Sequence, residues 1–177
     1  RRYSSAASDV YKRQSILFSD LSSYSTITEN MSPEVALEFL NEYFTAMHEV
    51  IKEFNGHILN YIGDSIMVVF GAPEKLRNHE NQAVKCSLKM KEKLKELNYK
   101  WDEDETSRYW KNHDIESITM RIGIHTGSVI AGNLGSQEML QYSTIGDTVN
   151  VSARLEQANK DFNTEISCLL YTSPSPR

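Results

Sequence analysis

Several features that would point to a particular class of protein are scarce or missing in this sequence. Of its 177 residues only two are cysteines, Cys86 and Cys168, and no CxxC or Cys/His spacing surrounds them. A disulfide framework and a structural zinc site are therefore not expected, whereas a reducing compartment is. No apolar run reaches the roughly 20 residues of a membrane-spanning helix, and the N-terminus lacks a signal-peptide core. We expect a soluble, cytoplasmic domain, and membrane attachment of a longer protein is left open.

Positive charge is also scarce. The formal net charge is -5, and no long basic run occurs. The electrostatic footprint of a protein that binds nucleic acid or an anionic membrane is therefore missing, and neither is expected as a partner. Hydrophobic residues make up 40% of the sequence, which is enough for the core of one globular domain.

The two ends differ from the middle. Residues 1–14 and 168–177 show no periodicity that would continue a packed element, and they resemble read-through flanks from environmental shotgun assemblies. We expect both to be non-native or disordered flanks. Residues 15–167 then form one domain that is truncated at its C-terminus.

Three helices are predicted. Ser32 fits an N-cap with Pro33 at the first helical position, and Gly56 fits the terminator. The apolar face of this helix is expected to consist of Ala36, Leu40, Phe44, Met47, Ile51 and Phe54. A second amphipathic helix is predicted over 78–97, with a buried face of Ala83, Met90, Leu94 and Leu97. A third helix begins near Asp147.

Short apolar runs predict strands between these helices. SILFSD (15–20) is one strand, and HILNYI and SIMVVF flank Gly63-Asp64 as in a type II′ hairpin. Residues 116–135 predict two strands around a tight Thr126-Gly127 turn, and NTEIS begins a last strand. The charged segment 98–114 predicts a surface loop whose two tryptophans either pack within the protein, the simpler interpretation, or dock a partner. This order predicts an α+β fold built on antiparallel hairpins.

Two carboxylates stand at strand ends. Asp20 and Asp64 each adjoin a short apolar strand, so one sheet edge could hold both. Two carboxylates about 4 Å apart, at an effective dielectric near 20, repel by roughly 4 kcal/mol, so a cation is expected between them. Oxygen ligands favour Mg²⁺ or Mn²⁺, which share ligation with substrate phosphates. Taken alone, each residue is better explained as a loop cap or an ordinary turn residue.

A polar pair lies on the third predicted helix. Asn150 and Arg154 are spaced i, i+4 and project from one face. The guanidinium could bind a phosphoryl oxygen bidentately, and the amide could fix a ribose oxygen. In isolation, a solvated polar face explains the same spacing.

Five motifs in a fixed order carry a resemblance to a known family: FSDLSSYS, LNEYF, YIGDSIMVVFG, MRIGIHTGSVIAGNLG and YSTIGDTVNVSARLE. From about Ser15 to Ser167 the chain resembles the catalytic domain of class III nucleotidyl cyclases, the adenylyl and guanylyl cyclases. Any one motif is a modest hint, but five in order are specific. The resemblance implies a ferredoxin-like, mostly antiparallel sheet covered by helices. It also implies a head-to-tail homodimer with active sites at the interface and an upstream regulatory domain.

The resemblance implies two phosphate- and metal-binding elements. Asp20 and Asp64, with the backbone carbonyl of Leu21, would hold two metal ions, Mg²⁺ or Mn²⁺. Arg121 would contact phosphate. Backbone N–H groups of the serine-rich loop would bind the terminal phosphates, from Ser22, Ser23, Tyr24, Ser25 and Thr26.

The resemblance also implies the remaining site residues and the reaction. Asn150 and Arg154 would orient the ribose and stabilise the transition state, and with Asn60 and Ser143 they would face the metal carboxylates of the other chain. The ribose 3′ hydroxyl would attack the α-phosphorus of a purine nucleoside triphosphate and expel pyrophosphate, leaving a 3′,5′-cyclic nucleotide for intracellular signalling. Metal ions can activate the hydroxyl and stabilise the charge, so no side chain need be a general base.

Two other residues invite a catalytic role but have simpler explanations. His125 is better explained as a buried strand histidine satisfied by the backbone. Cys86 is better explained as core packing, because no histidine is placed to activate it.

Departures from the family pattern bear on the substrate. Family adenylyl cyclases carry Lys where this chain has Asn60, and Asp or Thr where it has Ser143. The Ser143 hydroxyl could accept from the adenine N6 amine, whereas the Asn60 amide suits adenine N1 or guanine O6 and N1–H equally. The Glu usual for guanine is missing, so ATP is the expected substrate and GTP the alternative. The phosphate-binding Lys of the family lies past the end of this chain.

Three functions therefore compete. An active purine nucleotide cyclase, with ATP as the expected substrate, agrees with the full set of metal, phosphate and ribose residues. A degenerate cyclase homology domain, which only binds nucleotide or dimerises, is favoured by Asn60. A ferredoxin-like module of another class, such as an RNA-recognition fold or a diguanylate cyclase, is disfavoured by the acidic charge, the lack of paired RNP aromatics and YIGDS in place of GGDEF.

Overall fold

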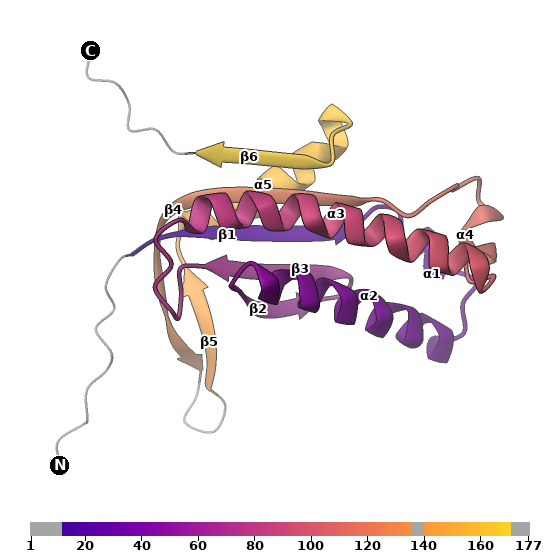
Figure 1. Cartoon of the computed structure of the whole chain (residues 1–177), viewed down its shortest axis with the longest axis horizontal. Helices are drawn as coiled ribbons and strands as arrows, with labels where there is room; N and C mark the ends of the chain where they lie inside the picture. Colours follow the sequence, from indigo (N-terminus) through magenta and orange to yellow (C-terminus); the bar gives the residue numbers. More distant parts are fainter. Residues whose placement is uncertain (1–11, 136–139, 171–177) are drawn as a thin grey trace.

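The structure is a computed structural model that describes residues 12–135 and 140–170. Its sheet has the order β2-β3-β1-β4-β5, and β6 pairs with β4 (Figure 1). The strands are β1 (Lys12–Leu21), β2 (Gly56–Ile62), β3 (Ser65–Phe70), β4 (Met120–Gly135), β5 (Leu140–Ile145) and β6 (Ile166–Leu170). The described strand pairs are antiparallel except β4–β6, which is parallel. The predicted α+β fold with a mostly antiparallel sheet is confirmed.

Helices cover both faces of the sheet. They are α1 (Tyr24–Thr28), α2 (Pro33–Glu53), α3 (His79–Glu103), α4 (Arg108–Lys111) and α5 (Asp147–Phe162). Ile122 and Ile124 of β4 belong to the core shared with α2 and α3, whereas Gly123 between them contacts α5. Figure 1 shows α2 and α3 in front of the sheet and α5 behind it. Over residues 12–135 and 140–170, no helix combines the length and apolar character needed to cross a membrane.

The predicted start of α2 is confirmed, but its predicted end is wrong. The Ser32 hydroxyl accepts a hydrogen bond from Val35 N–H (3.4 Å), and Pro33 is the first helical residue. The residue with left-handed backbone after the helix is Asn55 (φ +57), which tolerates this conformation better than most residues. Gly56 instead begins β2, where an added Cβ would lie 2.7 Å from an Ile51 methyl group.

The buried face of α2 is shifted from the predicted one. Of the predicted residues Met47 and Ile51 are buried, and the other four are half-buried. The face also contains buried residues that the prediction omitted, namely Phe39, Tyr43, Ala46 and Val50.

The predicted loop at 98–114 is wrong. Helix α3 continues to Glu103 and α4 follows, while the four residues predicted for the buried face of α3 are all buried. Trp101 and Trp110 are fully buried with ring centroids 5.6 Å apart, and both pack on Phe39 of α2. The exposed positions of this segment are so highly charged that they mask the helical period. The simpler interpretation, in which the tryptophans pack within the protein, is confirmed.

The predicted hairpin at Thr126-Gly127 is also wrong. Residues 120–135 form the single long strand β4, which pairs with β1 over 120–129 and with β5 over 130–135. Gly127 serves a close approach rather than a turn, because an added Cβ would lie 2.4 Å from Thr148 Oγ1 of α5. The second half of β4 therefore extends beyond its pairing with β1 and runs alongside β5 (Figure 1).

Both predicted flanks contribute to strands. Long β4 offers a partner for residues 12–14, so β1 begins at Lys12 rather than at residue 15. Strand β6 likewise continues through residues 168–170 alongside β4. The rest of the predicted flanks, 1–11 and 171–177, lies outside the described residues.

Candidate active site

Asp20 and Asp64 lie together at adjoining ends of neighbouring strands. The register of β1 and β3 brings Asp20 beside the two-residue turn that holds Asp64, and Gly63 in that turn has φ +61. Two hydrogen bonds cross between the strands: Leu21 N–H donates to Asp64 Oδ2 (3.0 Å), and Ser65 Oγ donates to Asp20 Oδ1 (2.8 Å). Each carboxylate is thus held by the residue that follows the other one.

The charge at this position suits a cation. Burial and the nearby Asp20 carboxylate raise the pKa of Asp64 to about 6, because two negative groups in a partly dry setting repel. In the part of the chain that the structure describes, no cluster of three or more His, Cys, Asp or Glu side chains could hold a metal. The structure brings together two carboxylate donors, and the predicted metal role of the Leu21 carbonyl stays a prediction. These hard oxygen donors fit Mg²⁺, which usually completes its shell with water and substrate phosphates.

Arg121 connects the half-buried Asp20 to a buried acid on α5. It lies opposite Asp20 in the β1–β4 register, and its Nη2 donates to Asp20 Oδ2 (2.6 Å). Its Nε donates to Oε1 of Glu156 on α5 (2.9 Å). Glu156 is only 8% exposed, and this burial raises the pKa of its carboxyl while Arg121 opposes the shift.

Sequence reasoning missed Glu156 and Ser65. A signal for Glu156 exists in the buried face of α5, which is polar at helical spacing: Thr148, Ser152, Glu156 and Asn159. A polar stripe on a helix that packs against a sheet indicates specific partners, because unpaired buried polar groups are costly. Ser65 carries no comparable signal, since serine after a turn is common.

The predicted phosphate loop forms the short helix α1. Ser23 precedes it with φ +61, and the first helical hydrogen bond runs from Ile27 N–H to Ser23 O (3.0 Å). The backbone N–H groups of residues 24–26 precede the first helical donor, Ile27 N–H, so they have no acceptor within the helix and can bind another group.

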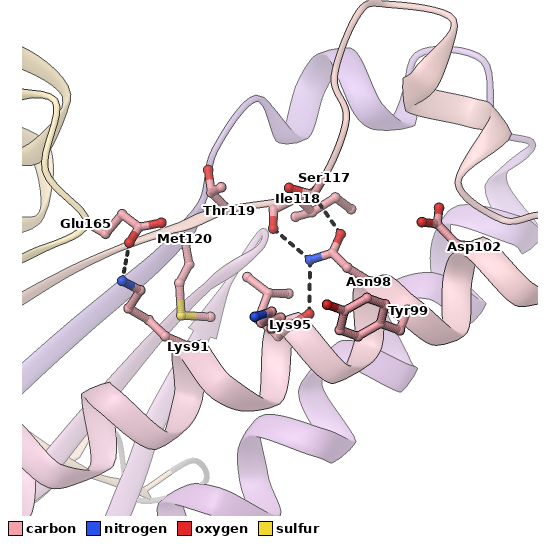
Figure 2. Close-up of a pocket in the computed structure, with 11 residues that line it drawn as sticks. Lys91, Lys95, Asn98, Tyr99, Asp102, Ser117, Ile118, Thr119, Met120 and Glu165 are labelled. Carbon is pink, nitrogen blue, oxygen red and sulfur yellow. Dashed lines mark hydrogen bonds and ion pairs between the residues drawn. The ribbon is translucent and has the colours of Figure 1, made fainter.

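Ser22 differs from the rest of this loop because it is attached to the start of β4. Its N–H donates to Thr119 O (2.9 Å), so this predicted phosphate donor is already engaged. The neighbouring Ile118 is held by Asn98 of α3 through two hydrogen bonds, Ile118 N–H to Asn98 Oδ1 (2.8 Å) and Asn98 Nδ2 to Ile118 O (2.9 Å). Figure 2 shows these bonds in the wall of a cavity of about 380 Å³ between α3 and β4. The loop beside the carboxylates is thereby anchored to the core.

Asn60 and Ser143, the predicted base-binding residues, lie on strands that approach each other. Asn60 is exposed on β2 and Ser143 is half-buried on β5. Gln141 Nε2 donates to Leu59 O (2.9 Å), which joins β5 to β2 next to Asn60. Because side chains on a strand alternate, Ser143 projects to the same side of β5 as Gln141.

Asn150 and Arg154, the predicted ribose and transition-state residues, are both exposed on α5. Glu156, by contrast, lies on the buried face of the same helix. Among the described residues, no hydrogen bond or ion pair connects Asn150, Arg154 or Asn60 to the cluster around Asp20. The structure thus contains two groups of predicted site residues that a single chain does not join.

The two residues with simpler explanations behave as predicted. His125 is 6% exposed and its Nδ1 hydrogen-bonds to the backbone carbonyl of Leu169 (2.9 Å). Cys86 is fully buried in the core, and this burial raises the pKa of its thiol to about 12. Neither group is poised for catalysis.

Known proteins resemble this chain in both sequence and structure. A sequence model of the adenylate and guanylate cyclase catalytic domain matches residues 7–173. Adenylate cyclase 1 of Rhizobium meliloti is 35% identical over 150 residues, covering 85% of this chain and 21% of that protein. The receptor-type guanylate cyclase gcy-28 of Caenorhabditis elegans is 32% identical over 161 residues, covering 91% of this chain and 12% of that protein. The crystal structure of the guanylyl cyclase Cya2 matches with a TM-score of 0.74 and 33% identity, over 85% of this chain and 72% of that chain.

These relatives show the family of the chain, but they are named for two different substrates. The chain spans about a fifth of the Rhizobium meliloti protein and about an eighth of the Caenorhabditis elegans protein. One of these relatives is named an adenylate cyclase and the other two guanylate cyclases, so both purine bases are represented. The family model covers nearly the whole chain. The chain belongs to the adenylate and guanylate cyclase catalytic domain family, whose members are purine nucleotide cyclases.

Proposed function

We propose that this chain is the catalytic domain of a cytoplasmic adenylate cyclase, which converts ATP to 3′,5′-cyclic AMP and pyrophosphate as a homodimer. The observation that carries this proposal is the pair Asp20 and Asp64, each hydrogen-bonded by the residue that follows the other. Burial and the neighbouring Asp20 carboxylate raise the pKa of Asp64, which is an arrangement that a stable fold has no need of. Such a pair is useful where a divalent cation and a polyphosphate bind.

The cluster around Asp20 would bind the triphosphate. Asp20, Asp64 and the Leu21 carbonyl would hold two Mg²⁺ or Mn²⁺ ions, which supply a lowered pKa for the ribose 3′ hydroxyl and charge stabilisation on the phosphates. The backbone N–H groups of residues 24–26 would bind the terminal phosphates. Arg121 would add a further phosphate contact.

The second group would act on the substrate held by another copy of the chain. Asn150 would orient the ribose, and Arg154 would stabilise negative charge on the α-phosphoryl group as the 3′ oxygen attacks and pyrophosphate leaves. Support comes from the exposure of both residues and from the absence of a bond, among the described residues, between them and the Asp20 cluster. A homodimer with two shared sites accounts for both facts.

The base preference rests on Asn60 and Ser143. The Ser143 hydroxyl can accept from the adenine N6 amine, and the Asn60 amide can donate to adenine N1. A second candidate is a guanylate cyclase, because the same amide can donate to guanine O6 and accept from guanine N1–H. The relatives gcy-28 and Cya2 favour this candidate, and the Rhizobium meliloti relative favours the first.

The test is a side-by-side assay of ATP and GTP with Mn²⁺, in which cyclic products are identified by mass spectrometry. The chain is assayed both alone and fused after Ser167 to the C-terminal segment of the Rhizobium meliloti relative. Cyclic AMP is the expected product, with kcat/KM about tenfold higher for ATP than for GTP, and EDTA should abolish it. No product from either nucleotide, with a folded dimer in hand, would overturn the catalytic proposal, whereas a preference for GTP would overturn only the base assignment.

A further inference from the structure

Glu156 is a buried acid for which the proposed reaction has no role. It projects from the sheet-facing side of α5, is 8% exposed, and accepts a hydrogen bond from Arg121 Nε (2.9 Å). A buried ion pair is weak evidence of stabilisation, because desolvation offsets most of its attraction. The presence of this pair therefore calls for a reason other than stability.

Attachment of α5 to the sheet does not depend on this ion pair. A Cβ added at Gly123 would lie 2.2 Å from the backbone of both Glu156 and Ser152, so the helix already rests on β4 at this point. Asn159 Nδ2 donates to Ile122 O (2.9 Å), one turn further along. The helix is thus held against the strand on both sides of position 156.

The ion pair does determine how Arg121 is oriented. Arg121 lies two residues before Gly123 on the same face of β4, so the close approach of α5 places the Glu156 carboxylate against its Nε. Its Nη2 donates to Asp20, and Nη1 has no hydrogen-bond partner among the described residues. Arg121 also lines a hollow of about 690 Å³ together with Ser22 and Lys160. Nε and Nη2 of the guanidinium are therefore engaged, whereas Nη1 has no partner among the described residues and belongs to a side chain that lines the hollow.

We propose that Glu156 is a positioning residue. By accepting a hydrogen bond from Arg121 Nε, it orients the guanidinium so that the remaining nitrogen, Nη1, can donate to the phosphates of the nucleotide. The proposal rests on the proposed function, because it assigns a phosphate to Arg121. It adds a residue on α5 that acts on the phosphates of its own chain, while Arg154, two positions earlier on the opposite face, would act on the substrate bound to a second copy.

The test is a double-mutant cycle of Glu156→Gln and Arg121→Lys, measured by equilibrium binding of the fluorescent nucleotide mant-ATP in Mn²⁺ and, separately, by KM and kcat. Lysine keeps the positive charge next to Asp20 but has no Nε and no planar fork. Glu156→Gln is expected to weaken mant-ATP binding and raise KM about tenfold with Arg121 present, and by less than about twofold in the Arg121→Lys background. Equal losses in both backgrounds would overturn the proposal.

Glu96→Gln is the matched control, because Glu96 is also ion-paired, with Lys93, but its side chain is 59% exposed and does not line the hollow beside Arg121. It should change mant-ATP binding by less than about twofold; an effect as large as that of Glu156→Gln would contradict the proposal. If Glu156→Gln does not fold by circular dichroism, Glu156→Asp replaces it, since the shorter carboxylate falls short of Nε and should give the same pattern. A wild-type chain that binds mant-ATP but makes no cyclic product would overturn the proposed function, and the binding cycle would still decide the role of Glu156.

Discussion

The two groups of candidate site residues differ in how far a single chain completes them. The cluster of Asp20, Asp64, Arg121 and Glu156 is partly or fully buried, and its members hydrogen-bond to one another or to adjacent residues. Asn60 and the pair Asn150 and Arg154 are exposed, and no described residue bonds to the Arg154 guanidinium. The first group is organised without a ligand, whereas the second shares no hydrogen bond or ion pair with it among the described residues.

The two groups differ in how much folding free energy their assembly costs. The buried cluster brings two repelling carboxylates together and compensates one of them with an arginine that is itself oriented by a third acid. Its organisation costs folding free energy, so changes there should alter both stability and activity. The exposed group costs almost nothing to fold, so changes there should alter activity alone.

The largest effect is expected when Asp64 becomes Asn. Cyclic nucleotide formation should fall by at least about 10³-fold, because the substitution removes a charged ligand for the proposed cations. Stability in EDTA at pH 7 should rise by about 1 kcal/mol, since the cost of burying the Asp64 charge and its repulsion from Asp20 both disappear, and the solvent already screens part of this cost. Urea unfolding and a product assay on the same preparation measure the two changes.

Asp161→Asn is the control for this substitution, because Asp161 is exposed near the end of α5. It should leave both quantities near their wild-type values. If Asp64→Asn instead lowers stability and keeps activity, the carboxylate pair is an ordinary structural feature.

A pair of arginine substitutions should separate the two groups by stability. Arg121→Ala leaves Glu156 buried without its charged donor and Asp20 without compensation, and it should lower the free energy of unfolding by about 2 kcal/mol. Arg154→Ala should change it by less than about 0.5 kcal/mol, because the side chain is exposed. Both variants should lose activity. Equal destabilisation by the two substitutions, measured in urea without nucleotide, would remove the distinction between the groups.

The same contrast explains which parts of the site were predictable from sequence. Asp20 and Asp64 adjoin local apolar runs within motifs, so their position at strand ends follows from neighbouring residues alone. Asn150 and Arg154 were predictable because helical spacing places them on one face. Glu156 was not, since its role depends on the approach of α5 to Gly123, a contact between segments that are distant in sequence.

The errors in the fold have the same origin. Gly127 carries the local signal of a turn, yet a close contact with Thr148 explains it, and the strand continues through it. Trp101 and Trp110 lie in a highly charged segment whose period is obscured, and only their packing on Phe39 shows that the segment is part of the core. Local signals therefore predicted the start of α2 and most of the strands. The parts of the chain whose conformation depends on contacts with distant residues could not be predicted from local sequence.

A smaller effect is expected at the exposed base-binding position. Asn60→Lys places the residue type of family adenylyl cyclases there, and an ammonium can donate to adenine N1 but cannot accept from guanine N1–H. The ratio of kcat/KM for ATP to that for GTP should rise about tenfold, and urea unfolding should be unchanged, because Asn60 is exposed. The assay runs both nucleotides in competition in one reaction, with Asn60→Gln as the control that keeps the amide. An unchanged ratio would show that Asn60 does not contact the base.

The smallest effect, and the most direct test of the comparison, comes from mixing two inactive variants. Asp20→Ala disables the buried cluster around Asp20, and Arg154→Ala disables the exposed group that contains Asn150 and Arg154. When equal amounts exchange subunits, about half of the dimers contain one of each, and one of the two sites in such a dimer combines an intact Asp20 with an intact Arg154. The mixture should therefore recover about a quarter of wild-type activity, whereas two variants of one group, Asp20→Ala with Asp64→Asn, should recover none. No recovery in the first mixture, with subunit exchange verified by native mass spectrometry, would place both groups in one chain's site. Recovery in the second mixture would show that Asp20 and Asp64 do not belong to the same chain's half of a site.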